Sequence, residues 1–275
     1  MSRILDALRK QEGGAPSRPT PLERAQQPSP SPSPAPAAEH LPPPEPALAE
    51  TTAPPEIWNS GFLPNIPEDF LREMGNLRLQ IDTALTGRRP RVLMFVSAVA
   101  GEGSSTVAAT FARVLSLDQS SRVLLVDANA RRPGLSTYLG LPEGPGLPEV
   151  LHSGYPFAET VRAVERQNLH VMLSMPGQAV SGNLYAQQLV RAFLSQYGAH
   201  YDYVIFDAPP VLESPETTVL GGAVDTSLLV VRAARTKGGV VNRAIESLAK
   251  AGVPVLGVVL NRRRLDIPEF LYKRI

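Results

Sequence analysis

The sequence lacks cysteine altogether and holds only four histidines and one tryptophan among 275 residues. Without cysteine, disulfides and thiolate metal sites are excluded, and the reducing cytosol is the expected compartment of the protein. No apolar run approaches the roughly 18 residues of a membrane-spanning helix, and the first residues lack the apolar core of a signal peptide. The net charge of +1 gives no reason to expect bulk affinity for nucleic acid. We therefore expect a cytoplasmic protein with no nucleic-acid partner.

Proline, by contrast, is abundant and concentrated near the N-terminus. Residues 13–67 hold more than half of the 28 prolines, together with much Ala, Ser and Glu. Proline fixes φ and donates no amide hydrogen bond, and so few apolar residues do not offset the entropy of ordering the chain. We expect residues 13–67 to form a disordered linker, partly polyproline-like. Ahead of it, residues 1–12 predict a short amphipathic helix that docks on a protein or a membrane surface, with a frayed terminus as the alternative.

Residues 68–275 have a normal size for one domain. An amphipathic helix is predicted over 68–86, and apolar runs then alternate with helical stretches. The predicted strands are 92–96, 123–126, 170–174, 203–206, 227–231 and 253–260, and the predicted helices are 105–117, 184–197, 215–222 and 238–251. The strands are apolar almost throughout, as expected when helices cover both faces of a parallel sheet. We therefore predict a doubly wound α/β domain with its ligand site at the carboxyl ends of the strands.

The loop after the first predicted strand, residues 98–105, fits the phosphate-loop pattern Ala/Gly-x4-Gly-Lys-Ser/Thr except at one position. Ser104 stands where the pattern needs lysine. Gly101 and Gly103 let successive amides turn toward an anion, and the following helix adds its positive end. Ser105 stands where a hydroxyl binds Mg²⁺. The loop therefore predicts a phosphate-binding fold with a damaged catalytic group, and an ordinary strand–helix turn is the alternative.

Two later strands each end in an aspartate, Asp127 and Asp207. Beside a phosphate site, such a carboxylate holds Mg²⁺ or accepts a proton. Arg131 and Arg132 follow the first aspartate, and their planar guanidinium groups suit phosphate oxygens, although solvated arginines are the alternative. Asn261 ends the last predicted strand, where its amide offers a donor and an acceptor to a purine edge. Each feature is weak singly, but their order on one parallel sheet argues against coincidence.

These segments resemble the bacterial tyrosine kinases of capsular and exopolysaccharide synthesis, in their stand-alone cytoplasmic form. The resemblance covers about residues 68–273, and the run from Asp207 to Leu212 is especially characteristic. The segments that carry it are residues 97–103, 123–133, 201–212 and 253–261. Residues 1–10 also resemble the start of family members found in exosortase-linked polysaccharide clusters. The resemblance implies a P-loop NTPase fold of the MinD/ParA-like branch with a deviant Walker motif.

The family's activity would be ATP-dependent tyrosine autophosphorylation, with ATP or ADP and Mg²⁺ as cofactors. Its partner would be a membrane polysaccharide co-polymerase of the Wzz kind or a synthase complex, which implies recruitment to the inner face of the cytoplasmic membrane. Carried over by position, Asp127 would be the base or metal partner and Asp207 the Mg²⁺ carboxylate, with the hydroxyl of Ser105 as a further metal ligand. The positions that would line the phosphates are Gly101, Gly103, Ser104, Ser105 and Thr106.

Two departures from the family pattern lie in the phosphate site. Ser104 replaces the phosphate-loop lysine, and Asn129 replaces the second aspartate of the family's Asp-x-Asp loop. By analogy with buried charge pairs, losing the lysine costs about 2–5 kcal/mol of phosphate binding, or about 30- to several-thousand-fold in affinity. We therefore expect nucleotide and Mg²⁺ to bind weakly, unless Arg131 or Arg132 substitutes for the missing cation.

Two further departures concern assembly and phosphorylation. The family's Glu-x-x-Arg-x-x-Arg motif for ring assembly is not intact, because Arg72, Gly75 and Arg78 stand at its positions. Homo-oligomer formation is therefore left open. The C-terminal tyrosine cluster that receives phosphate is expected to be missing, because the sequence stops at Ile275, shortly after Tyr272.

Three functions are weighed on these grounds. The favoured hypothesis is a degenerate, pseudokinase-like regulator or scaffold of exopolysaccharide or capsule assembly and export. The second is an active autokinase that binds ATP with a substitute cation. The third is a positioning ATPase of the ParA/MinD type, which is disfavoured because residues 97–99 lack the additional lysine that those proteins carry early in the loop.

Overall fold

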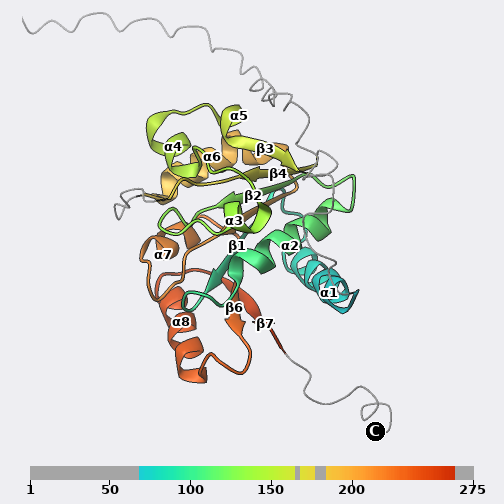
Figure 1. Cartoon of the computed structure of the whole chain (residues 1–275), viewed down its shortest axis with the longest axis vertical. Coiled ribbons are helices and arrows are strands. Elements are labelled where there is room, and N and C mark those ends of the chain that lie inside the picture. The colour runs from blue at the N-terminus through green and yellow to red at the C-terminus, as the bar shows by residue number, and fades with distance from the viewer. Residues whose placement is uncertain (1–67, 165–167, 177–183, 264–275) are drawn as a thin grey trace, which may run out of the picture. The chain divides into compact units, whose positions relative to one another are not determined.

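The structure, a computed structural model, describes residues 68–164, 168–176 and 184–263 (Figure 1). The predicted helix over residues 1–12, the predicted linker over 13–67 and the last residues, 264–275, lie outside the described residues. Their assignments therefore stay predictions. None of the helices that the structure describes is long and apolar enough to cross a membrane.

A seven-stranded sheet forms the centre of the domain, in the order β3-β4-β2-β5-β1-β6-β7. All neighbours pair in parallel except β3, which runs antiparallel to β4 at one edge. The strands are β1 (Arg91–Ser97), β2 (Val123–Asp127), β3 (Val161–Val164), β4 (Leu169–Met172), β5 (Tyr203–Asp207), β6 (Thr226–Arg232) and β7 (Val255–Asn261). The six predicted strands are confirmed, with ends within two residues of the prediction. The sequence did not reveal β3, because this short edge strand contains an arginine and is buried only at its first residue.

Helices surround the sheet and are of very unequal length. They are α1 (Glu68–Ala84), α2 (Ser104–Ser116), α3 (Leu135–Leu139), α4 (Leu147–Ser153), α5 (Phe157–Thr160), α6 (Gln187–Gln196), α7 (Glu216–Gly221) and α8 (Gly238–Lys250), with a 3₁₀ turn, η3, at Gly198–His200. The prediction missed α3, α4 and α5, since helices this short show no helical periodicity. The helix predicted over 184–197 begins later, at Gln187, because residues 184–186 form a turn and its exit.

Both faces of the sheet are covered, as predicted. Along β1, Leu93 and Phe95 point into a core formed with α1, α2 and α3. Met94 and Val96 point into the opposite core, which residues of α4 to α8 complete. The doubly wound α/β fold is therefore confirmed. Because the long strands are parallel, the loops that follow β1, β2 and β5 meet at one edge of the sheet.

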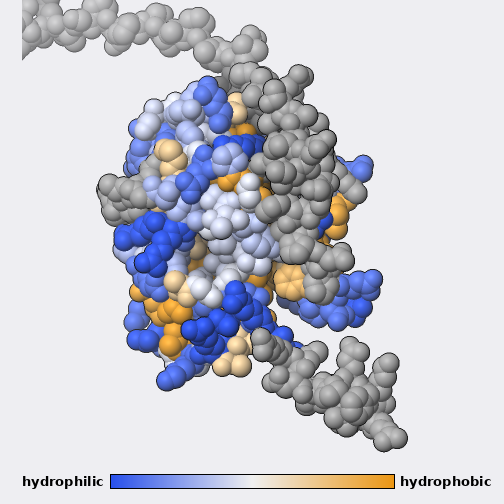
Figure 2. All heavy atoms as spheres, in the orientation of Figure 1, coloured by the Kyte–Doolittle hydropathy of each residue, from blue (hydrophilic) through white to orange (hydrophobic). Residues whose placement is uncertain are grey.

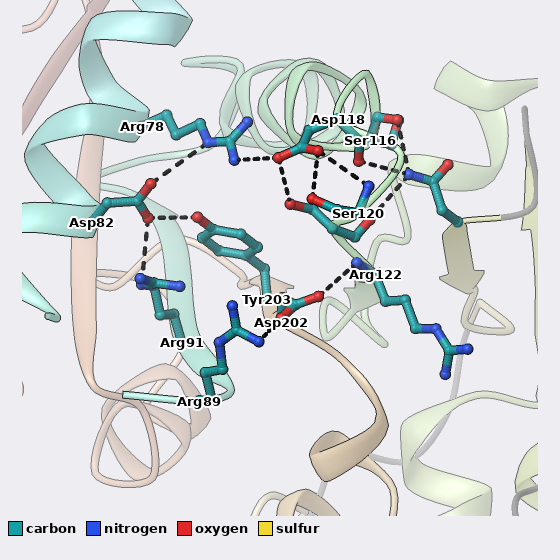
Figure 3. Close-up of polar contacts among 12 residues, drawn as sticks. Arg78, Asp82, Arg89, Arg91, Ser116, Asp118, Ser120, Arg122, Asp202 and Tyr203 are labelled. Carbon is teal, nitrogen blue, oxygen red and sulfur yellow. Dashed lines mark hydrogen bonds and ion pairs between the residues drawn. The ribbon is translucent and has the colours of Figure 1, made fainter. Parts of the chain in front are cut away.

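Charged side chains hold α1 against the sheet at the end where the parallel strands begin (Figure 3). Asp82 of α1 accepts a hydrogen bond from the Tyr203 hydroxyl and lies 3.3 Å from Nε of Arg91. One turn earlier, Arg78 donates to Asp118 at 2.8 Å and lies 3.5 Å from Asp82. Of the three positions of the family's ring-assembly motif, only the last, Arg78, holds the residue that the motif requires. The guanidinium of Arg78 contacts Asp118 and Asp82 of its own chain.

Candidate functional site

The loop between β1 and α2 turns sharply at two glycines. Gly101 has φ of 83° and Gly103 has φ of 93°, a region that residues with a Cβ rarely adopt. Gly103 directly precedes α2, and no side chain of the described residues caps this helix. The amides of its first turn have no acceptor within the helix, and they carry the positive end of the helix dipole. The backbone of the loop therefore has the features of the predicted anion cradle.

Glu102 supports this loop from inside, a role that the sequence did not suggest. Its side chain is buried, and Oε2 accepts hydrogen bonds from the amides of Ala98 at 2.7 Å and Val99 at 3.0 Å. The other oxygen accepts one from the Thr236 hydroxyl. The backbone carbonyl of Glu102 accepts a hydrogen bond from Nδ2 of Asn261 at 2.8 Å. One carboxylate thereby ties the loop to the segment between β6 and α8.

A cavity of about 550 Å³ opens beside the loop. Figure 2 shows residues of near-neutral hydropathy, drawn white, at the centre of the face around α3, with hydrophilic residues beside them. The residues named from the sequence that line the cavity are Gly101, Gly103, Ser104, Ser105, Thr106, Asn129, Arg131 and Arg132. The tertiary structure thus brings the loops after β1 and β2 together around one hollow, and Pro210, Glu213 and Ser214 of the loop after β5 complete it.

Asn261 lies close to the loop but is not among the residues that line this cavity. Its side chain packs on Gly103, where an added Cβ would lie 2.3 Å from Nδ2 of Asn261. Both polar atoms of this side-chain amide form hydrogen bonds with the backbone, since Nδ2 donates to the carbonyl of Glu102 and Oδ1 accepts from the amide of Arg262 at 2.8 Å. In this structure, Asn261 therefore positions the loop, and contact with a purine stays a prediction.

The two arginines after β2 differ in their surroundings. Nε of Arg131 donates to the buried carboxylate of Glu216 in α7 at 2.8 Å. The backbone amide of Arg132 donates to Oδ1 of Asn129 at 3.2 Å, while its side chain is exposed at the cavity. Within the part of the chain that the structure describes, no carboxylate forms a salt bridge with the Arg132 guanidinium. Arg132 is therefore the less engaged of the two cations.

Two aspartates lie side by side at the ends of neighbouring strands, and neither is among the residues that line the cavity. Asp127 of β2 and Asp207 of β5 are register partners, and both are fully buried. The oxygens of Asp127 accept hydrogen bonds from the amides of Asn129 at 2.9 Å and Leu135 at 3.2 Å. Neither oxygen of Asp207 has a hydrogen-bond partner among the described residues. The pair therefore holds a buried carboxylate without a hydrogen-bond partner in the described part of the chain.

The burial of these two aspartates changes their acidity. Burial raises the pKa of Asp127 to about 7. Burial, and next the negative charge of Asp127, raise the pKa of Asp207 well above its ordinary value, and the nearby hydroxyls of Ser105 and Ser104 act against this shift. Two buried carboxylates without a cation retain a proton or call for a positive partner. Within residues 68–164, 168–176 and 184–263, no cluster of three or more His, Asp or Glu forms a metal site.

The fold and the loop agree with the comparison to known proteins. The ParA family, in the form described as NUBPL iron-transfer P-loop NTPase, matches residues 89–270. The chain therefore belongs to the ParA-like P-loop NTPases, a class with a nucleotide-binding fold. A ParA family ATPase from Chlorobium tepidum shares this fold, with a TM-score of 0.54 at 22% identity over 64% of this chain and 76% of that one.

Within this class, more similar proteins narrow the assignment. Tyrosine-protein kinase YwqD of Bacillus subtilis (strain 168) is 33% identical over 190 residues, which cover 69% of this chain and 80% of that protein. The kinase domain of the Escherichia coli tyrosine kinase ETK superposes with a TM-score of 0.64 at 25% identity, over 72% of this chain and 79% of that one. This chain belongs to the bacterial tyrosine-kinase family. The resemblance predicted from the sequence is thus confirmed.

The match to longer relatives is partial. Tyrosine-protein kinase etk of Escherichia coli (strain K12) is 28% identical over 185 residues, which cover 67% of this chain but 25% of that protein. The kinase domain of that protein alone covers 72% of this chain, and the family model matches residues 89–270. What the remainder of the longer relatives does is therefore not carried over to this chain.

Proposed function

We propose that this chain is a regulator or scaffold of exopolysaccharide or capsule assembly and export, derived from a tyrosine kinase that has lost efficient phosphoryl transfer. It would act beside a membrane co-polymerase or synthase complex, at the inner face of the cytoplasmic membrane. The observation that carries the proposal is Ser104, which lies in the cradle where the family pattern has lysine. No lysine is among the described residues that line the cavity. Both observations support a backbone site that keeps its shape without its principal cation.

ATP or ADP would place its phosphates against the loop amides, from Gly101 to Thr106. Mg²⁺ would be held by the Ser105 hydroxyl together with Asp127 and Asp207. This set suits the ion, because Mg²⁺ takes oxygen ligands and is bound by one or two carboxylates plus phosphates and water. The unpartnered oxygens of Asp207 support the assignment. When bound, Mg²⁺ would offset the negative charge of the phosphates.

The chain's own residues give little further support to phosphoryl transfer. Asp127 would accept a proton or hold the metal, but the charge that develops on the transferring group needs fixed positive partners. Arg131 is engaged by Glu216, and Asn129 offers an amide where the family has a carboxylate. The proposal therefore combines weak nucleotide binding with slow or absent tyrosine phosphorylation.

The replacement Ser104→Lys tests this proposal. Calorimetric titration with Mg-ATP should give an affinity for the variant that is at least about 30-fold higher than for the wild type. Ser104→Ala is the matched control, because it alters the same side chain without adding charge, and its affinity should stay close to that of the wild type. Micromolar binding of ATP by the wild type together with steady tyrosine autophosphorylation would contradict the proposal. Unchanged binding in Ser104→Lys would show that the cradle no longer accommodates a lysine.

The second candidate function is an active autokinase with a substitute cation, and the exposed guanidinium of Arg132 favours it. In that case Arg132→Ala should remove both ATP binding and tyrosine labelling. Arg131→Ala is the control, because its guanidinium is held by Glu216 and should matter less. Tyrosine labelling that is undetectable in the wild type would exclude this candidate.

A further inference from the structure

The loop after β5 places a carboxylate of this chain inside the phosphate cradle. Oε1 of Glu213 accepts a hydrogen bond from the amide of Ala100 at 2.9 Å, and both residues line the cavity. The amides of Ala98 and Val99 are bonded to Glu102. The amides of residues 98–100 therefore already donate hydrogen bonds to side chains of the same protein. The donors left for a bound anion begin at Gly101.

Backbone contacts keep Glu213 in this place. The amide of Val211 donates to the carbonyl of Ser97 at 2.9 Å, and the amide of Leu212 donates to the carbonyl of Ala98 at 3.3 Å. These bonds join the loop after β5 to the start of the loop after β1. The side chain of Glu213 is exposed, but its backbone is fixed next to the cradle. These contacts therefore keep Glu213 in the wall of the cavity.

The charge around Glu213 is unfavourable for an additional phosphate. Ser104 supplies no positive charge and Arg131 is paired with Glu216, so that Arg132 is the one cation without a carboxylate partner among the described residues that line the cavity. Asp127 and Asp207 are buried at the ends of β2 and β5, although neither is among the residues that line the cavity. A phosphate that reached the amide of Ala100 would have to displace the Glu213 carboxylate and then remain near its charge. Like charges a few ångströms apart repel each other even in a partly solvated site.

We propose that Glu213 is a specificity-determining residue that makes the cavity prefer a nucleoside diphosphate to a nucleoside triphosphate. The carboxylate takes the hydrogen bond that a terminal phosphate would otherwise receive from Ala100. Phosphates bound at the first turn of α2 contact other amides and are affected less. This inference rests on the proposed function, since it requires nucleotide phosphates in the loop. It gives the regulator a ligand of defined class, the diphosphate product of ATP-dependent reactions.

The test compares ADP and ATP, each with Mg²⁺, by calorimetric titration of the full chain with and without Glu213→Gln. Glutamine keeps an oxygen acceptor for the Ala100 amide and removes the charge. The wild type should bind ADP more tightly than ATP. Glu213→Gln should tighten ATP binding by about tenfold and change ADP binding by less than about threefold. Glu246→Gln in α8 is the control, because Glu246 is exposed and is not among the residues lining the cavity, and it should leave the ratio unchanged.

The salt dependence of the ratio of ATP affinity to ADP affinity separates an effect of the Glu213 charge from an effect of its shape. Raising the ionic strength should reduce the difference between the wild type and Glu213→Gln, because exposed charges are screened, whereas a merely structural effect would not respond. The same four titrations in the Ser104→Lys background extend the test to a site with higher affinity. ADP binding with an ATP/ADP ratio that Glu213→Gln leaves unaltered would overturn the role of Glu213 and leave the nucleotide site standing. No binding of either nucleotide in any variant would reject both the role and the nucleotide site.

Discussion

The two ends of the central strands carry similar charged side chains but differ in how those charges are balanced. Where the strands begin, Arg78 and Arg91 surround Asp82, and the Tyr203 hydroxyl donates to the same carboxylate (Figure 3). Where the strands end, two aspartates are buried together, and one has no hydrogen-bond partner among the described residues. Balanced charges fix a helix on a sheet, whereas unbalanced buried charges reduce stability and are typical of ligand sites.

The acidities at the two ends show the same contrast. Hydrogen bonds from Arg78, Ser120 and Ser121 hold the pKa of Asp118 well below its ordinary value. Burial and the hydrogen bond to Asp82 raise the pKa of Tyr203 to about 12, so that its hydroxyl keeps its proton. At the other end, burial raises the pKa of both aspartates. At neutral pH, the charged groups where the strands begin therefore stabilise the fold, whereas ionisation of the two aspartates where the strands end destabilises it.

The largest effect is expected from removing charge where the strands end. Asp207→Asn should increase the free energy of unfolding at pH 7, without Mg²⁺, because the folded state no longer buries an ionisable carboxyl. In the wild type, the raised pKa of Asp127 favours folding fully below about pH 4, and this contribution should be lost as the pH rises through about 7. The raised pKa of Asp207 acts in the same direction. Urea unfolding at a series of pH values measures both effects.

The matched substitution at the other end should have the opposite sign. Asp118→Asn removes the charged partner of Arg78 and should decrease the stability at neutral pH. Saturating Mg²⁺ should reduce the gain from Asp207→Asn, since in the proposed site the ion would stabilise the ionised carboxylates. A wild-type stability that does not change between pH 4 and 7, with no gain in Asp207→Asn, would mean that the two ends are balanced alike.

The next effect concerns the attachment of α1. Asp82→Ala should decrease the free energy of unfolding by about 2–3 kcal/mol, because it leaves partly buried arginines and a tyrosine hydroxyl without their common acceptor. Asp69→Ala is the control, since Asp69 forms an exposed pair with Arg72 at 3.5 Å and should contribute less than about 0.5 kcal/mol. Urea unfolding of the two variants compares them directly. Equal, small losses would indicate that apolar contacts such as those of Met74 hold α1 by themselves.

The smallest effect is expected on the outer side of α1. Gly75 lies inside this helix, and no described atom lies within 4 Å of a Cβ added there. Gly75→Ala should therefore stabilise the protein by about 0.5–1 kcal/mol, because alanine favours the helix. Gly154→Ala should act in reverse, since Gly154 has φ of 62°. Thermal unfolding detects both changes, and a loss of stability in Gly75→Ala would show that this side of α1 is covered by something else.

Much of the fold could be predicted because its signals are local. Six strands are continuous apolar runs, and the glycine-rich loop has its spacing within a few residues. The sequence did not reveal β3 or the helices α3 to α5, since their packing partners, and not their own periodicity, stabilise them. At the site, the roles of Glu102 and Glu213 were missed. Glu213 contacts Ala100 across 113 positions of sequence, and the hydrogen bond of Asn261 to Glu102 spans 159.

The sequence by itself determined the class of fold, the glycine-rich loop and the serine at its lysine position, because each depends on residue type and short spacing. Only the tertiary structure decided which charges are compensated. Asp127 and Asp207 become register partners through the pairing of β2 with β5, whereas Arg78 and Arg131 find acceptors on other elements. The physical reason is that the free energy of a charge depends on its burial and its neighbours, and strand order and loop packing bring those neighbours together.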